Sequence, residues 1–200
     1  MNDKPYILCD VDGVCLDWCS KLPEYLLNHG IDNKKSMAAY AHGEYISPEE
    51  LTGLSIRKAH QLLSEYNASE WIKYLVPYKD ALQVVNLLKK EFNFIAVTSI
   101  GVDPECSRKR MMNLEFWFPG AFIDIKTVDI GESKLETLKQ FKSTFFIDDS
   151  PQYVKEGKEA GHISIRLVRD KRLDLINTIR CNDFFEVGSK IEELKWMIKS

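Results

Sequence analysis

Short apolar runs and amphipathic segments alternate along most of the chain. Five runs have the length and composition of buried strands: 6–9, 94–97, 121–128, the apolar part of 143–151, and 163–168. Segments with helical spacing separate them, at 80–92, 108–118, 133–141 and 151–161, and a further helix is predicted near 189–199. Strands that alternate with helices predict an α/β fold with an open, mostly parallel, doubly wound (Rossmann-like) sheet.

In the stretch 18–78 the alternation of apolar runs and amphipathic segments stops, and its sequence predicts no strand. A helix is expected before Gly30, and a second one begins at Ser47, which can cap the backbone ahead of Pro48. Leucines then recur at roughly helical spacing up to residue 63. We therefore predict two domains: an α/β core formed by 1–17 and 79–200, and a small helical cap formed by 18–78.

Polar side chains collect where three of the apolar runs end. In an open α/β sheet, ligands bind outside the carboxyl ends of the strands. If the three strands are parallel neighbours, their polar clusters meet at one edge. Four carboxylates so close together repel strongly unless a cation lies among them, and an all-oxygen ligand set suits Mg²⁺. The residues are Asp10 and Asp12, Thr98 and Ser99, and Asp148 and Asp149.

Three other interpretations fit these residues less well. An EF-hand beginning at Asp10 would need ligands or glycine where Val14, Cys15 and Lys21 stand. A receiver domain would place its lysine at the end of a later strand, whereas Lys134 precedes the last acidic pair. Plain turn aspartates would explain one strand end but not three. No Walker A, dinucleotide-binding, H-E-x-x-H or G-x-S-x-G motif occurs.

Composition and charge limit the expected binding partners and cellular location of the protein. The 200 residues include 27 basic and 30 acidic side chains, for a net charge of −3, so no strong nucleic-acid signal is present. The five cysteines form no C-x-x-C pair and are interpreted as free thiols rather than zinc ligands. The chain starts without a signal-peptide pattern, and no apolar run is long enough to span a membrane. A cytoplasmic protein is expected.

Four motifs in order resemble those of the haloacid dehalogenase (HAD) superfamily of phosphohydrolases. They are Asp10-Val11-Asp12-Gly13, the strand that ends in Thr98, Lys134, and Asp148-Asp149. The chain is more closely similar to the 5'(3')-deoxyribonucleotidase branch, through the run from Asp10 to Asp17-Trp18, through Thr98-Ser99 and through Ile147 to Pro151. That branch has proline after Thr-Ser, where this chain has Ile100-Gly101.

The resemblance implies a role for each residue. Asp10 is the expected nucleophile and Asp12 the expected general acid and base. Mg²⁺ is expected on Asp10, on the backbone carbonyl of Asp12, and on Asp148 and Asp149. Thr98, Ser99 and Lys134 are expected to bind the phosphoryl oxygens. Trp18 is a candidate for stacking on a base or sugar.

The resemblance also implies a function. We expect a magnesium-dependent phosphomonoesterase that forms an aspartyl-phosphate, with a nucleoside monophosphate as substrate. A polynucleotide 3'-phosphatase, a sugar-phosphate phosphatase and a non-catalytic phosphate-binding protein are the alternatives. The basic run from Arg108 to Arg110 is interpreted as a solvated helix face. The alternative is that Lys109 or Arg110 contacts the phosphate. The oligomeric state stays open.

Overall fold

Six parallel strands form the central sheet of the computed structural model, which describes residues 4–42, 46–169 and 172–198. The strand order is β5-β4-β1-β6-β7-β8, and every neighbouring pair is parallel. The strands are β1 (Tyr6–Cys9), β4 (Asn93–Ser99), β5 (Phe122–Val128), β6 (Phe145–Asp148), β7 (Ile163–Leu167) and β8 (Ile179–Cys181). The predicted doubly wound α/β sheet is confirmed.

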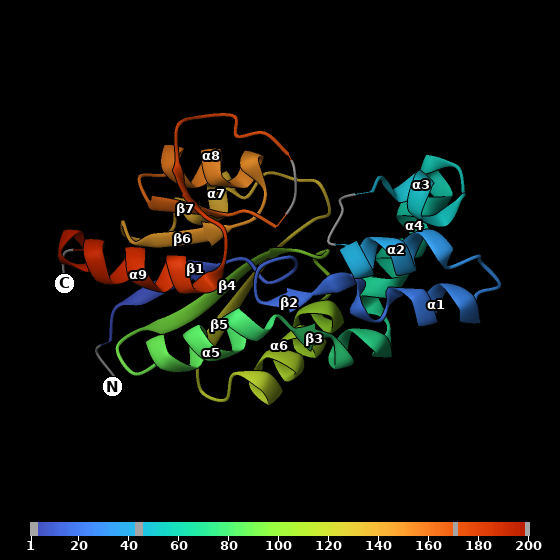
Figure 1. Ribbon diagram of the computed structural model, residues 1–200, viewed down its shortest axis with the longest axis horizontal. Helices are drawn as coiled ribbons and strands as arrows, with labels where there is room; N and C mark the ends of the chain where they lie inside the picture. Colours follow the sequence, from blue (N-terminus) through green and yellow to red (C-terminus); the bar gives the residue numbers. More distant parts are fainter. Residues whose placement is uncertain (1–3, 43–45, 170–171, 199–200) are drawn as a thin grey trace.

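Helices cover both faces of this sheet (Figure 1). Alternate residues of β1 point to opposite sides: Ile7 and Cys9 pack in the larger apolar core and Leu8 in the smaller one. The larger core lies against α5 (Lys79–Leu88), α6 (Pro104–Trp117) and α9 (Phe184–Leu194). The opposite face is covered by α7 (Leu135–Leu138) and α8 (Pro151–Glu159).

Strand β1 is the point at which the strand order of the sheet reverses. It runs from β1 through β4 to β5 on one side, then crosses to β6, β7 and β8 on the other. The carboxyl ends of β1 and β6 therefore flank the switch point, the position where open α/β sheets bind ligands. Asp10 follows β1 directly, and Asp148 is the last residue of β6.

Between residues 18 and 75, the described part of the chain contains helices only. They are α1 (Leu22–Asn28), α2 (Lys34–His42), α3 (Pro48–Thr52) and α4 (Ile56–Ala68), with 3₁₀ turns at Trp18–Ser20 and Glu70–Tyr74. In Figure 1 these helices lie to one side of the sheet. Their buried side chains nevertheless continue the larger core without a break. The division into a core and a cap stays a prediction.

Several predicted elements needed correction. A single helix was expected from Ser47 onward, but Gly53 adopts φ 70° and separates α3 from α4, because a left-handed residue ends a helix. The prediction of no strand in 18–78 was wrong: β3 (Val76–Pro77) pairs antiparallel with β2 (Leu16–Asp17). A two-residue strand that contains proline leaves no sequence pattern.

The C-terminal part of the chain also differs from the prediction. Its last helix begins at Phe184, not near Ser189, because Asp183 accepts the backbone N–H of Glu186 and caps it there. The predicted end at Lys199 lies outside the described residues. Strand β8 and helix α2 were not predicted, the first because three residues are too few for a period and the second because its polar and apolar positions are mixed.

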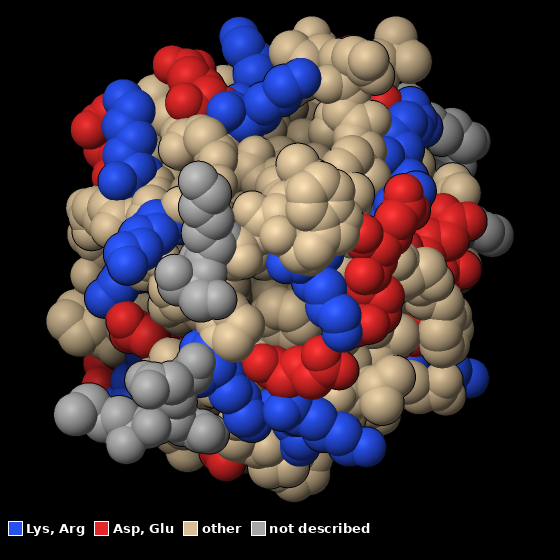
Figure 2. Space-filling view, turned by 90° about the vertical axis from the view of Figure 1, so that its left-hand side faces the viewer, with Lys and Arg blue, Asp and Glu red and all other residues tan. Residues whose placement is uncertain are grey.

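Two features of the surface bear on partners. None of the helices in the described ranges has both the length and the apolar character needed to cross a bilayer. On the face turned away from α1–α4, basic and acidic side chains are interspersed, with no large area of one sign (Figure 2).

Candidate active site

A pocket of about 860 Å³ opens at the carboxyl edge of the sheet. Strand ends, the loop after β1 and the segment after β7 all contribute to its wall. Eight site residues proposed from the sequence line it, whereas Lys109 and Arg110, the other candidates for contacting phosphate, do not. The eight are Asp10, Asp12, Trp18, Thr98, Ser99, Lys134, Asp148 and Asp149.

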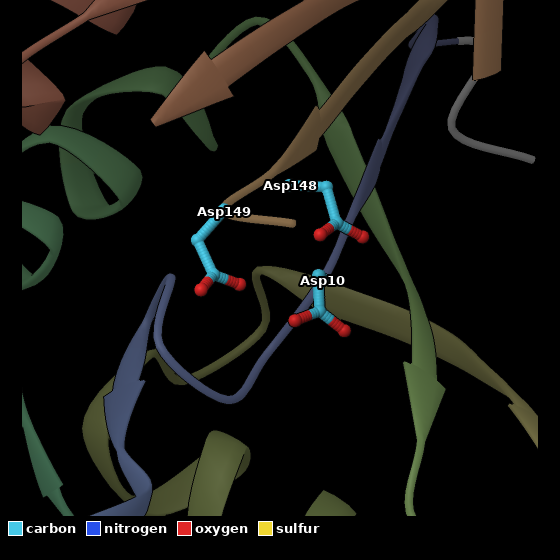
Figure 3. A group of neighbouring side chains, drawn as sticks. All are labelled: Asp10, Asp148 and Asp149. Atoms are coloured by element: carbon cyan, nitrogen blue, oxygen red, sulfur yellow. The ribbon is translucent and has the colours of Figure 1, made fainter. Parts of the chain in front are cut away.

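Three carboxylates form the floor of the pocket. One oxygen each of Asp10, Asp148 and Asp149 lies within 4.8 Å of the other two (Figure 3). Oxygens on opposite sides of a bound Mg²⁺ are about 4.2 Å apart, since each lies about 2.1 Å from the ion. The donor set, carboxylate oxygens only, therefore fits a hard divalent cation. The carboxylate of Asp12 is not a member of this group.

Gly13 lets the chain approach this cluster closely. Its φ of +78° is unfavourable for residues with a side chain, and a Cβ there would lie 3.0 Å from Asp149. The Val11 carbonyl accepts the N–H groups of Cys15 and Leu16, both at 2.9 Å, and closes the loop. The glycine of the Asp-x-Asp-Gly motif is thus required by both backbone conformation and space.

Lys134 lies in the middle of the acidic floor. Its Nζ donates to Asp10 Oδ1 at 2.7 Å and to Asp148 Oδ2 at 2.8 Å, and its side chain is 1% exposed. Burial alone lowers the pKa of Lys134, but the two facing carboxylates outweigh it and raise the pKa above its ordinary value. The lysine thus stays charged at any physiological pH.

Two neighbours hold Lys134 in place. Glu156 accepts its backbone N–H at 2.7 Å, and the ring of Tyr153 lies 4.3 Å from Nζ. Both Glu156 and Tyr153 come from α8, the helix that follows the last acidic pair. The position of the lysine is therefore linked to the strand end that supplies Asp148 and Asp149.

The two hydroxyl residues at the end of β4 have different environments. The Thr98 hydroxyl is buried and has no hydrogen-bond partner among the described residues. A buried polar group without a partner is costly unless a ligand satisfies it. Ser99, in contrast, donates to the Asp129 carbonyl at 2.9 Å and accepts the N–H of Gly131 at 3.3 Å. Thr98 is the one poised for a ligand oxygen, while Ser99 holds the 129–131 loop.

Asp12 faces a different cation from the other carboxylates. Arg110 Nη1 donates to Asp12 Oδ1 and forms an ion pair with it. Burial raises the pKa of Asp12 to about 6, although the charge of Arg110 acts in the opposite direction. A carboxyl with this pKa is present in both protonation states near neutral pH, as proton transfer in both directions requires.

Trp18 lines the pocket from the side of α1–α4. Its indole Nε1 donates to Asn67 Oδ1 at 2.8 Å, and its ring packs edge-on against Tyr66 with centroids 5.2 Å apart. The residue is partly exposed toward the pocket. One edge of the indole is therefore fixed in the helical insert while the remainder borders the space for a substrate.

Two arginines of the site were missed by the sequence interpretation. Arg172 donates to Asp149 Oδ2 at 2.8 Å. Arg169 pairs with Asp80 at 3.0 Å and stacks over the ring of Tyr78. Both follow the carboxyl end of β7, so the strand-end rule that indicated Asp10 would have indicated them as well. Arg110, noted as one of two possible phosphate contacts, instead reaches Asp12.

Solved structures with the haloacid dehalogenase-like fold match the chain over almost its whole length. A haloacid dehalogenase-like family hydrolase from Streptococcus pneumoniae is 16% identical, with a TM-score of 0.65, over 96% of this chain and 100% of that one. A Bacillus subtilis protein assigned to the HAD hydrolases and bound to magnesium is 20% identical, with a TM-score of 0.59, over 94% and 99%. Further matches include an L-2-haloacid dehalogenase. The chain therefore has the HAD-like fold.

Sequence comparison adds one curated relative. An uncharacterised 32.4 kDa protein of Enterobacteria phage T4, encoded in the gp30–rIII intergenic region, is 36% identical over 160 residues. The match spans 78% of this chain but 58% of the relative, so this chain accounts for less than two thirds of the relative's length. No protein-family model matches the chain.

Proposed function

We propose that this protein is a magnesium-dependent phosphomonoester hydrolase that forms an aspartyl-phosphate on Asp10 and acts on nucleoside monophosphates. The observation that carries the proposal is the meeting, in one pocket, of three clustered carboxylates, the buried Lys134 and the Thr98 hydroxyl, which has no hydrogen-bond partner among the described residues. A phosphate ester is the ligand whose charge and oxygens suit all three features at once.

The chain's own residues support a two-step transfer. A carboxylate oxygen of Asp10 attacks phosphorus, the ester P–O bond breaks, and its electron pair goes to the leaving oxygen. Protonated Asp12 gives its proton to that oxygen, which leaves as an alcohol. In the second step Asp12 takes a proton from water, and the resulting hydroxide attacks the same phosphorus. The bond to Asp10 breaks, and inorganic phosphate is released.

The phosphoryl oxygens need donors that are already in position. Thr98 supplies a hydroxyl that bonds to none of the described residues, and Lys134 supplies a charge that is held beside the nucleophile. Bound to Asp10, Asp148 and Asp149, Mg²⁺ would supply the positive charge that lets an anionic ester approach this acidic floor.

Dehalogenase chemistry is the rival reaction on this fold. Halide departure from carbon needs no proton, so a dehalogenase would use a carboxyl poised for proton transfer only to activate water in its second step, whereas a phosphomonoesterase would use it in both steps. Asp12, with its pKa near 6, is such a carboxyl. The acidic cluster also favours a phosphate substrate over a haloacid, since it provides a place for the cation that a dianion requires.

A panel of phosphate esters assayed with and without Mg²⁺ tests the function. Nucleoside 5'- and 3'-monophosphates, sugar phosphates and 3'-phosphorylated oligonucleotides should be compared by kcat/KM. We expect hydrolysis that stops with EDTA, returns with Mg²⁺ and favours nucleotides. Activity that chelation leaves unchanged contradicts the metal role, and a preference for sugar phosphates or oligonucleotides replaces the nucleotide assignment with the corresponding alternative.

The nucleotide assignment can also be tested at Trp18. If its indole stacks on a nucleobase, Trp18→Ala should lose about 1–3 kcal/mol of nucleotide binding, the usual range for such stacking. That loss is roughly ten- to hundredfold in kcat/KM. Glycerol phosphate has no ring to stack, so its hydrolysis should change little. Equal losses on both substrates would show that Trp18 serves only the packing against Tyr66.

A further inference from the structure

Arg110 is a buried cation with spare hydrogen-bonding capacity. It is 0% exposed, and its Nη1 bonds to Asp12 Oδ1. Its Nε and Nη2 have no partner among the described residues. Asp12 is thus its single ion-pair partner in the described part of the chain. The ion pair with Asp12 is therefore the main interaction that offsets the cost of burying the guanidinium.

The helix that carries Arg110 is fastened to the end of the helical insert. Lys109 Nζ pairs with Glu70 at 3.1 Å, Asn113 Nδ2 donates to the Leu75 carbonyl at 3.1 Å, and Trp117 Nε1 donates to the same carbonyl at 2.9 Å. These three side chains recur every four residues along one face of α6. The base of Arg110 is therefore held rigidly.

We propose that Arg110 is the positioning residue for Asp12 in proton transfer. Its Nη1 engages one carboxyl oxygen, Oδ1, so that the other is left to face the substrate in the pocket that Asp12 lines. A carboxyl bound on one oxygen by a rigid guanidinium cannot rotate freely, and proton transfer depends on a well-placed oxygen. This role rests on the phosphoryl transfer proposed above.

The role predicts a loss that depends on the leaving group. Asp12 donates its proton to the leaving oxygen as the ester P–O bond breaks, and that oxygen departs with the bond's electron pair. A p-nitrophenolate leaves readily without a proton, whereas the alkoxide of benzyl phosphate does not. The two esters are of similar size, so they differ mainly in their demand for Asp12.

The experiment compares kcat/KM for these two esters in Arg110→Met and Arg110→Lys. This constant reports the first step, in which the esters differ, and leaves out the second step, in which Asp12 activates water for both alike. Because general acid catalysis contributes about 10²–10⁴-fold, Arg110→Met should lose about a hundredfold on benzyl phosphate and less than about threefold on p-nitrophenyl phosphate. Arg110→Lys keeps the charge but loses the planar fork, so it should regain part of the benzyl phosphate rate. Exposed Arg108→Met, on the same helix, is the matched control and should affect neither ester.

Combining Arg110→Met with Asp12→Asn tells positioning from general support of the fold. If Arg110 acts through Asp12, the double variant should be no slower on benzyl phosphate than Asp12→Asn alone. Equal losses on both esters, or additive losses in the double variant, would overturn the role.

If Arg110→Met does not fold, Arg110→Lys gives the decision by the same ester contrast. If the unchanged protein hydrolyses neither ester with Mg²⁺, the proposed function itself fails and this role falls with it.

Discussion

Asp10→Asn should abolish phosphatase activity while the protein stays folded. The amide of asparagine is too weak a nucleophile to attack phosphorus, so the first of the two steps cannot occur. Removal of a catalytic nucleophile costs about 10⁶-fold in enzymes that use one, so we expect turnover below detection. The measurement is the release of inorganic phosphate from a nucleotide at saturating Mg²⁺.

Controls decide whether such a loss is chemical. Asp124 lies on β5 outside the pocket and pairs with Lys126, so Asp124→Asn should keep full activity. Unfolding by urea should show that Asp10→Asn remains cooperative. Ordinary turnover by a folded Asp10→Asn protein would refute the assigned nucleophile.

Lys134→Met should cost both stability and activity. The change leaves Asp10 and Asp148 buried side by side without their shared cation. Removing one partner from a buried ion pair destabilises proteins by about 3–5 kcal/mol. We expect a drop of that size in the free energy of unfolding, measured by urea denaturation in the presence of EDTA. Phosphate release should also fall, because the charge proposed to bind the phosphoryl group is gone.

The stability loss should depend on pH in a defined direction. Burial raises the pKa of Asp148 well above its usual range, although Lys134 lowers it. Without the lysine, the folded variant would bind protons that the unfolded chain releases, so its stability should rise as the pH falls. The gap to the unchanged protein should therefore narrow from pH 8 to pH 5. A constant gap would mean that the loss is one of packing alone.

An exposed lysine on the same side of the sheet gives the matched control. Lys139 pairs with Glu136 in solvent. Exposed pairs of this kind contribute about 0–1 kcal/mol, so Lys139→Met should change the free energy of unfolding by little. A comparable loss in both variants would contradict the special status of Lys134.

The fold and most of the site could be predicted because strand ends are visible in a sequence. An apolar run that stops at Asp10 or at Asp148 marks the carboxyl end of a buried strand. Parallel strands bring those ends to one edge whatever the loops between them do. The convergence of Asp10, Thr98 and Asp148 on one pocket therefore follows from local pattern plus one topological rule.

Side-chain partners on helices could not be predicted in the same way. The basic run at 108–110 puts charge on more than one face of α6, so its sequence does not show which charge is buried. In the structure, Arg108 stays in solvent with Glu105, while Arg110 turns inward to Asp12. Which side of α6 meets the sheet edge depends on its packing against the insert, and that packing involves residues far apart in the chain.

The sequence by itself determined the sheet and the acidic, hydroxyl and lysine residues gathered at its carboxyl edge, because each follows from periodicity and from where apolar runs end. Only the tertiary structure decided how those groups are satisfied. In the part of the chain that the structure describes, the Thr98 hydroxyl has no hydrogen-bond partner, whereas Ser99 holds a loop and Asp12 is bound by an arginine 98 residues away. Hydrogen bonds and ion pairs depend on distances of a few tenths of an ångström, which only the packed chain defines.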